Sequence, residues 1–219
     1  IKNKFPPFYN FRDISKIVNT CSKIKLRSGI IFRSASLSRY DSDTILSFLK
    51  THNIRYIIDL RLPWEIEYHG KRRGFYSEEI RSKYVVNIPL EINVRCYIKE
   101  NPIKNLYYAI LKDQKETIKT LFEKYFAYAD NKPLIIHCEG GKDRTGVIIA
   151  LLLKLIGVED ECIIDDYLAS YGDAKRENIE FLLNIIDKEF GGIERYLVDY
   201  CGISLSTINR IKDILVVKE

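Results

Sequence analysis

The stretch Pro133-Leu134-Ile135-Ile136-His137-Cys138-Glu139-Gly140-Gly141-Lys142-Asp143-Arg144-Thr145-Gly146 decides how this chain folds and what it can do. Residues 133–137 are a continuous apolar run that ends in a histidine, a pattern typical of a strand buried in a parallel sheet. After a glycine-containing loop, residues 143–156 are apolar nearly all round, which predicts a helix buried in the centre of the protein. A buried strand, a loop and a buried helix in succession predict an α/β fold.

Outside this stretch, strand patterns come mainly before it and helix patterns mainly after it. Short apolar strands are expected over residues 54–60 and 84–88, and residues 24–32 indicate a hairpin that turns at Ser28-Gly29. After Gly157 only helical stripes follow. We therefore expect an α/β protein with a central parallel-rich sheet flanked by helices and a helical C-terminal part.

The chain is expected to form one domain over residues 1–219, because its 219 residues contain neither an internal repeat nor a low-complexity linker. Residues 64–83 are polar and highly charged, so we expect them to form an exposed insertion. Residues 157–219 are expected to pack as a helical tail on the same domain.

Composition narrows the class of function. Lys and Arg number 35 against 30 Asp and Glu, and the net charge of +5 favours anionic substrates but is too weak to predict nucleic-acid binding. The five cysteines are odd in number and contain no CxxC pair, so at least one thiol should be free. The cysteines and the three histidines show no ligand spacing, which argues against a metal site.

Nothing in the sequence predicts a membrane span. The most apolar run, residues 147–156, is short and contains Lys154. The chain begins at Ile1 and has no methionine, so the natural start of the protein is not seen. We expect a cytoplasmic protein, with secretion as the alternative, and the sequence predicts no oligomeric state.

The loop that follows His137 has the residues of a phosphate-binding nucleophilic site. The strand delivers Cys138 to the carboxyl edge of the sheet, where open α/β sheets bind their ligands. Gly140 and Gly141 allow the backbone to curl around an anion, and the loop amides and the helix N-terminus supply donors and a positive field that favours the Cys138 thiolate. The residues expected to bind the phosphate are Glu139, Gly140, Gly141, Lys142, Asp143 and Arg144.

The same loop contains the groups for a two-step reaction. Cys138 would attack phosphorus to form a thiophosphate, which water would then hydrolyse. Arg144 can fork onto two phosphoryl oxygens, and Thr145 can donate its hydroxyl to the sulfur. His137 is expected to orient the loop through hydrogen bonds. Because Arg144 and the amides stabilise the charge, no metal and no other cofactor is expected.

The loop resembles the signature of the protein tyrosine phosphatase superfamily, which is His-Cys, five residues, then Arg and Ser or Thr. Its ending, Gly-Lys-Asp-Arg-Thr-Gly, is similar to the atypical tyrosine phosphatases of bacteria and fungi. The resemblance implies a cysteine phosphatase P-loop fold and action on phosphotyrosine, and for some members on phosphoserine, phosphothreonine or phosphoinositides. Further similar motifs are Asn10–Asp13, Phe32–Ala35, Ile58–Arg61, Asp165–Leu168 and Gly192–Leu197.

Two aspartates are candidates for the general acid. Asp143 lies next to Arg144, where myotubularin-like lipid phosphatases also carry an acid, and its alternative role is to cap the helix. Asp59 belongs to an Asp-Leu-Arg motif, and its alternative role is an ion pair with Arg55 or Arg61. We slightly favour Asp143. The Trp-Pro-Asp element of the larger tyrosine phosphatases is missing, and Pro63-Trp64-Glu65 resembles it only superficially.

Several charged residues outside the reaction steps have two interpretations each. Lys142 either reaches a second anionic group on the substrate or is a solvated surface lysine. The run 71–73, Lys-Arg-Arg, is expected to be solvated, with docking of acidic substrates or of a membrane surface as the less favoured alternative. Arg12, Asp13 and Arg33 are expected to brace the active site from below rather than to take part in catalysis.

These features predict a protein-tyrosine or dual-specificity phosphatase that hydrolyses phosphate monoesters through a cysteinyl-phosphate intermediate. The alternative within the same chemistry is a phosphoinositide phosphatase, which Lys142 and Asp143 suggest. An alternative from another class is an inactive phosphate-binding module, which would be expected to lack Cys138 or Arg144. The expected partner is therefore a phosphorylated protein or a phosphoinositide.

Overall fold

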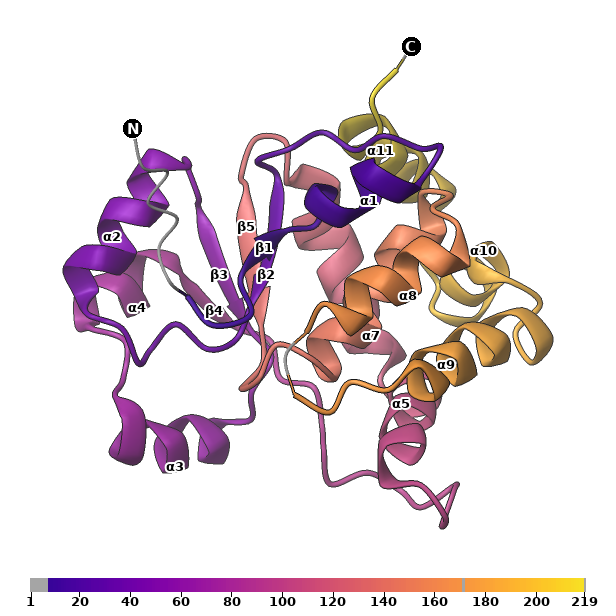
Figure 1. Ribbon diagram of the computed structural model, residues 1–219, viewed down its shortest axis with the longest axis horizontal. Helices are drawn as coiled ribbons and strands as arrows, with labels where there is room; N and C mark the ends of the chain where they lie inside the picture. Colours follow the sequence, from indigo (N-terminus) through magenta and orange to yellow (C-terminus); the bar gives the residue numbers. More distant parts are fainter. Residues whose placement is uncertain (1–7, 171, 219) are drawn as a thin grey trace.

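A computed structural model describes residues 8–170 and 172–218 of the chain and contains a five-stranded sheet between two layers of helices (Figure 1). The strand order is β1-β2-β5-β3-β4, with β1 antiparallel to β2 and all other neighbours parallel. The strands are β1 (Arg12–Asp13), β2 (Ile31–Ser34), β3 (Tyr56–Asp59), β4 (Val85–Asn87) and β5 (Leu134–His137). The predicted parallel-rich α/β sheet is thus confirmed.

The helices alternate with the strands up to β5 and then form the whole C-terminal part. Before β5 they are α1 (Ser15–Cys21), α2 (Ser42–Thr51), α3 (Pro63–Arg73), α4 (Glu78–Tyr84), α5 (Pro102–Asp113) and α6 (Lys115–Thr120), which continues in wider and tighter turns to Tyr128. After β5 they are α7 (Arg144–Leu155), α8 (Asp160–Leu168), α9 (Arg176–Lys188), α10 (Ile193–Arg195), which runs on to Tyr200, and α11 (Leu205–Leu215).

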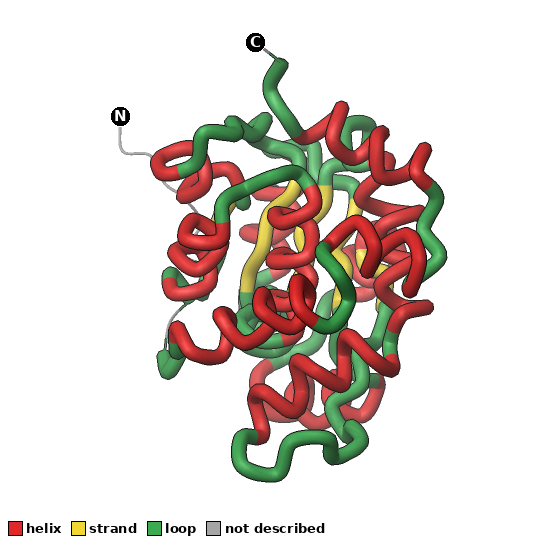
Figure 2. The backbone as a smooth tube through the Cα atoms, turned by 90° about the vertical axis from the view of Figure 1, so that its right-hand side faces the viewer, coloured by secondary structure: helices red, strands yellow, loops and turns green. Residues whose placement is uncertain are grey.

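The sheet has a separate apolar core on each face, because successive side chains of a strand point to opposite sides. Ile57 and Ile135 face the smaller core, which α2 and α4 cover. Ile58 and Ile136 face the larger core, to which α5 and the helices after β5 contribute. Figure 1 shows the two helical layers to the left and right of the strands, and Figure 2 shows the larger layer in front of the sheet.

Helix α7 is the centre of the larger layer, as its apolar sequence predicts. All but one of its residues are buried, with Lys154 as the exception. The helical tail packs on it, since residues of α8, α9 and α11 belong to the same apolar cluster as β5. A disulfide between Cys21 and Cys162 additionally joins α1 to α8, and Cys96, Cys138 and Cys201 are free.

The structure corrects two expectations about the surface elements. Residues 24–32 do not pair as a hairpin, because β2 pairs with β1 and Leu26 instead forms a bridge with Val216. The segment 64–83 is not exposed throughout, because it folds into α3 and α4 and buries Glu65 and Ile80 on its inner side. Within this polar sequence, α3 buries the carboxylate of Glu65 and α4 buries the apolar side chain of Ile80.

The described helices include none that combines the length and the apolar character needed to cross a lipid bilayer.

Candidate active site

Cys138 directly follows the central strand β5, at the edge where the parallel strands β2, β3 and β5 all end. Its side chain is 3% exposed and lies at the bottom of a cavity of about 420 Å³. The loop residues Glu139, Gly140, Lys142, Asp143 and Arg144 line the same cavity, together with Tyr9, Ile92, Leu106, Gly172 and Asp173. The structure therefore places the predicted phosphate-binding residues around one cavity, except Gly141, which is not among the lining residues.

The backbone of the loop is held from outside through its carbonyl groups. The carbonyls of Glu139, Gly140 and Gly141 accept hydrogen bonds from Ser36 N (3.0 Å), Asn10 Nδ2 (3.0 Å) and Arg33 Nη2 (2.8 Å), respectively. In a trans peptide the following N–H points the opposite way from the carbonyl. The amides of residues 140–142 are therefore turned toward the inside of the loop, where they can donate to an anion.

Gly141 is the one loop position where a side chain has no room. Its φ is +68°, and a Cβ placed on it would stand 2.1 Å from the carbonyl oxygen of Ser34. A Cβ on Gly140 would meet nothing within 4 Å. Only the second glycine of the pair is thus required by close approach and by positive φ.

Arg144 is oriented by a carboxylate that the sequence did not identify. Its Nη1 and Nη2 donate to the two oxygens of Glu65 at 2.7 and 2.8 Å, and both side chains are buried. Glu65 in turn accepts from the amide of Leu62 at the start of α3. Glu65 therefore takes one hydrogen from each of the two terminal nitrogens of the guanidinium. The Nε hydrogen and the second hydrogen of Nη2 form a side-on fork, which can donate to a phosphoryl group in the cavity.

His137 is buried and tied into the scaffold, as expected of a loop-orienting residue. Its Nδ1 lies 2.8 Å from the carbonyl of Cys138, and its Nε2 lies 2.9 Å from the hydroxyl of Tyr76. Because a carbonyl can only accept, Nδ1 carries the proton and Tyr76 donates to Nε2. Burial lowers the pKa of His137 below its ordinary value, which favours this neutral form.

The Thr145 hydroxyl does not make the hydrogen bond to sulfur that the sequence suggested. Its Oγ1 is buried and has no hydrogen-bond partner among the residues that the structure describes. Thr145 stands in the first turn of α7, one residue after Arg144. The hydrogen bond from Thr145 to the sulfur of Cys138 therefore stays a prediction.

Asp143 faces the catalytic cavity and does not cap α7 with its side chain. Its Oδ1 accepts a hydrogen bond of 2.7 Å from the hydroxyl of Tyr107, which also lies 2.9 Å from the hydroxyl of Tyr167. Its Oδ2 lies 3.8 Å from the ammonium of Lys142. The carboxyl group is thus held in place on one oxygen, beside the cavity that would hold the phosphate.

Asp59 is in a very different environment from Asp143. It is 1% exposed, and Arg61 donates to both of its oxygens, at 3.0 Å from Nε and 2.7 Å from Nη2. Burial alone would raise the pKa of Asp59, but the hydrogen bonds and the positive charge of Arg61 outweigh it and lower the pKa. The ion pair with Arg61, which was the alternative role of Asp59, is therefore what the structure contains.

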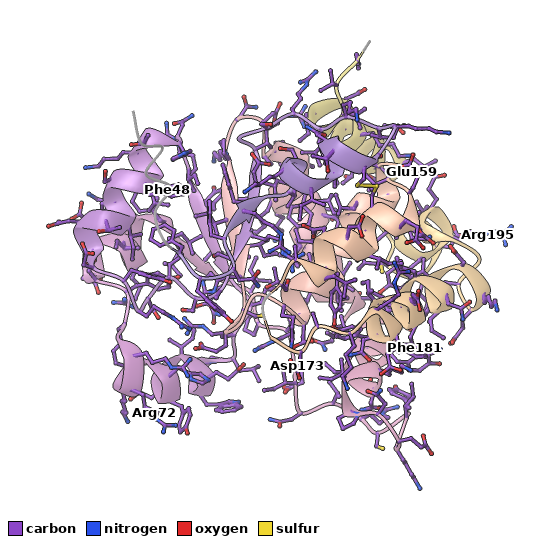
Figure 3. The ribbon with its side chains drawn as sticks, in the orientation of Figure 1. Phe48, Arg72, Glu159, Asp173, Phe181 and Arg195 are labelled. Atoms are coloured by element: carbon purple, nitrogen blue, oxygen red, sulfur yellow. A yellow bond between two sulfur atoms is a disulfide. The ribbon has the colours of Figure 1, made fainter. Side chains whose placement is uncertain are left out.

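Lys142 extends from the loop toward the segment between α8 and α9. It forms an ion pair with Asp173 and lies near Asp143. Burial works against its charge, but the hydrogen bond to Asp173 and the charge of Asp143 raise its pKa. Lys142 and Asp143 also line a second cavity of about 250 Å³, which adjoins the first. Figure 3 shows Asp173 at the edge where the strands end.

Arg12 and Arg33 lie beneath the loop, as expected, and share one buried carboxylate. Asp166 in α8 accepts from Arg12 Nε at 2.8 Å and from Arg33 Nη1 at 2.6 Å, and Arg33 continues to the carbonyl of Gly141. Asp13 has a different role, because it accepts hydrogen bonds from the amides of Ser15 (2.8 Å) and Gly29 (2.6 Å). It therefore fixes the β1–α1 turn and does not brace the loop.

Sequence reasoning missed several residues that hold the site. They are Asn10, Glu65, Tyr76 and Tyr107. Weak signals existed for Asn10, which belongs to the motif Asn10–Asp13, and for Glu65, which is the third helical residue after a start marked by Pro63. Tyr76 and Tyr107 lie in segments without such a signal, and they contact His137 and Asp143 across 61 and 36 positions of sequence.

Residues 4–178 match the tyrosine phosphatase family. The chain belongs to this family. The triple specificity protein phosphatase PtpB of Mycobacterium tuberculosis is 23% identical to it over 287 aligned positions, which cover 97% of the chain and 98% of PtpB. A putative tyrosine-protein phosphatase of Cupriavidus necator is 44% identical over 182 residues, or 81% of the chain and 64% of that relative.

The chain was also compared with solved structures. The catalytic core of Siw14 aligns with a TM-score of 0.49 and 20% identity over 89% of this chain and 93% of that one. The predicted family is confirmed by the family match. With the family, the class of enzyme is also established: the chain is a phosphoric monoester hydrolase of the protein-tyrosine-phosphatase type.

Proposed function

We propose that the chain hydrolyses phosphotyrosine and related phosphate monoesters, with Cys138 as nucleophile, Arg144 as phosphoryl ligand and Asp143 as general acid. The observation that carries the proposal is the loop itself. Cys138 lies at the bottom of a cavity whose wall is made by inward-turned amides and by Arg144, which Glu65 holds in a fixed orientation. Such preorganised donors act where negative charge develops in the transition state.

In the first step the Cys138 thiolate attacks phosphorus, so that an S–P bond forms as the bond from phosphorus to the leaving oxygen breaks. Asp143 gives its proton to that oxygen. The side-on fork of Arg144 and the amides of residues 140–142 hold the phosphoryl oxygens. In the second step water attacks phosphorus, Asp143 takes up a proton from the water, and the S–P bond breaks to restore the thiolate.

Asp143 suits the acid role better than Asp59 because of access. Asp143 lines the cavity, while Asp59 is 1% exposed and ion-paired with Arg61. A general acid must come within hydrogen-bond reach of the leaving oxygen, and the position of Asp143 in the lining of the cavity supports this role.

The first experiment measures hydrolysis of p-nitrophenyl phosphate by the wild type and by Cys138→Ser. We expect the variant to lose activity by about 10⁴-fold or more, since a serine hydroxyl is not ionised at neutral pH. Isothermal titration with inorganic phosphate should show that binding is retained. Full activity in the variant contradicts the mechanism, and an inactive wild type that binds phosphate indicates a binding module.

The second experiment separates the two aspartates. Asp143→Asn should lower kcat on a phosphotyrosine peptide by about 10²-fold, a usual loss for a general acid, and should remove the basic limb of the pH profile. Asp59→Asn should keep that limb, because it changes an ion pair beneath the site. If Asp59→Asn alone removes the limb, the assignment of the acid is wrong.

A phosphoinositide remains the second candidate substrate, favoured by one observation. The cavity at Cys138 adjoins a second cavity, and Lys142 and Asp143 lie on the wall that both share. A second phosphate could reach Lys142 and Lys175 there, although the carboxylates of Glu100, Asp143, Asp173 and Glu177 also line the second cavity. Parallel kinetics on a phosphotyrosine peptide and on soluble short-chain phosphoinositides decides between the substrates.

A further inference from the structure

A second group of basic side chains, three arginines and one histidine, lies beside the loop. Glu139, the residue after the nucleophile, stands at its centre. Its carboxylate is contacted by Arg73 Nη1 (2.8 Å), Arg61 Nη1 (3.0 Å), Arg39 Nη2 (3.4 Å) and His69 Nδ1 (3.7 Å). Arg39 follows β2, and His69 and Arg73 belong to α3. Side chains from three segments, the loop after β2, the loop after β3 and helix α3, thus converge on a single carboxylate.

These basic side chains have few carboxylate partners. Arg61 is also paired with Asp59. For Arg39, His69 and Arg73, in contrast, Glu139 is the only carboxylate within 4 Å in the described part of the chain. The Nε of Arg39 is buried and has no hydrogen-bond partner among the described residues. A buried donor without an acceptor is costly, so this position is suited to an acceptor that the protein itself does not supply.

The group is within reach of a substrate. Glu139 lines the same cavity as Cys138 and Arg144. The side chains of Arg39, His69 and Arg73 are 28%, 24% and 51% exposed, so solvent reaches all three. Arg72, the neighbour of Arg73, lies with α3 at the edge where the strands end (Figure 3). Because Glu139 follows Cys138 in the chain and lines its cavity, an anion that replaced the Glu139 carboxylate would bind beside that cavity.

We propose that Arg39, His69 and Arg73 form a second anion subsite that binds a further phosphate group of a multiply phosphorylated substrate, displacing the Glu139 carboxylate. The inference rests on the proposed function and specifies its substrate class. A phosphate monoester has about two negative charges and three acceptor oxygens at neutral pH, whereas a carboxylate has one charge and two oxygens. It can therefore serve both arginines and the unpartnered Nε of Arg39 together.

The test compares kcat/KM for substrates with two phosphates and with one. One pair is soluble short-chain phosphatidylinositol 3,5-bisphosphate and phosphatidylinositol 3-phosphate. The other pair is a peptide with two adjacent phosphotyrosines and the same peptide with one. Hydrolysis of p-nitrophenyl phosphate reports the reaction itself. The pair for which the wild type prefers two phosphates identifies the source of the second phosphate.

Arg73→Gln should lower the ratio of doubly to singly phosphorylated kcat/KM by about tenfold, the loss expected for one charge-assisted contact. Arg39→Gln should do the same. Arg72→Gln is the matched control, because it removes the same charge from the next residue of α3, whose side chain lies over Tyr68. Glu139→Gln should raise the ratio by roughly threefold, since it removes the resident anion.

The results that overturn the subsite are specific. If Arg73→Gln and Arg39→Gln leave both ratios unchanged while p-nitrophenyl phosphate is hydrolysed, the cations only tie α3 to the loop. If Arg72→Gln lowers the ratio as much as Arg73→Gln, general electrostatic attraction replaces the subsite. If Glu139→Gln lowers both substrates of a pair equally, Glu139 is only a structural link. An inactive wild type refutes the proposed function instead, which the aryl phosphate assay reveals separately.

Discussion

Two groups of arginines lie around the loop after β5, and they differ in burial and in the partners they have. Beneath the loop, Arg12 and Arg33 are at most 7% exposed and share Asp166. Their other hydrogen bonds go to acceptors that the fold holds in place, such as the carbonyls of Asp166 and Gly141. At the rim, Arg39 and Arg73 are partly exposed and depend on one loop side chain, Glu139.

The difference indicates two roles for the same residue type. A buried guanidinium with fixed acceptors can hardly move. Arg33 therefore fixes the loop backbone at Gly141 relative to α8 and β2. An exposed guanidinium that shares one carboxylate can exchange that partner for a ligand at small cost. Arginines beneath the loop therefore set its geometry, and arginines at the rim are available for recognition.

The largest effect is expected from removing the carboxylate beneath the loop. Asp166→Ala leaves two buried guanidinium groups without their anion and should reduce the free energy of unfolding by about 3–5 kcal/mol. In thermal unfolding this corresponds to a decrease in Tm of roughly 10 °C for a chain of this size. At the rim, Arg73→Gln should change the free energy of unfolding by no more than about 0.5 kcal/mol, as exposed sites usually do. Similar losses of unfolding free energy in both variants would contradict the difference between the buried and the partly exposed arginines.

A smaller effect is expected where the buried group meets the loop. Gly141→Ala puts a Cβ against the Ser34 carbonyl and at positive φ, so the backbone must shift and kcat should fall by about 10²-fold, as small misplacements of reacting groups do. Gly140→Ala is the matched change in open space and should cost less than about threefold. Steady-state kinetics on p-nitrophenyl phosphate measures both. Equal losses would mean that the close approach of Gly141 to β2 is unimportant.

An effect on the pH dependence of stability is expected at Asp59, whose partner Arg61 also contacts Glu139. Its pKa in the folded protein is below the ordinary 3.8, so its ionised form stabilises the fold above that pH. This contribution should disappear as pH falls through the lowered pKa. Urea unfolding of wild type and Asp59→Asn should therefore differ most at pH 7 and converge as the pH falls below 3.8. A gap that widens on acidification would contradict the direction of the shift.

Much of the fold and of the reaction could be predicted from local sequence. The apolar run before Cys138 and the apolar helix after Arg144 predict β5 and α7, and the spacing between cysteine and arginine predicts the chemistry, because all these signals lie within one segment. The hairpin expected over residues 24–32 was wrong because the strand pairing of this segment depends on residues outside it. Its residues pair with β1 and with Val216, which no local pattern reveals.

The sequence by itself predicted the family and the class of reaction, and it pointed to Cys138 as nucleophile and Arg144 as phosphoryl ligand, because a strand-loop-helix segment carries its own hydrogen-bond donors and its own thiol. Only the tertiary structure decided the surroundings of each carboxylate. It buried Asp59 against Arg61, left Asp143 at the cavity, placed Glu65 on Arg144 and gathered Arg39, His69 and Arg73 around Glu139. The physical reason is that the state of a charged side chain depends on burial and on partners, and both come from segments distant in the chain.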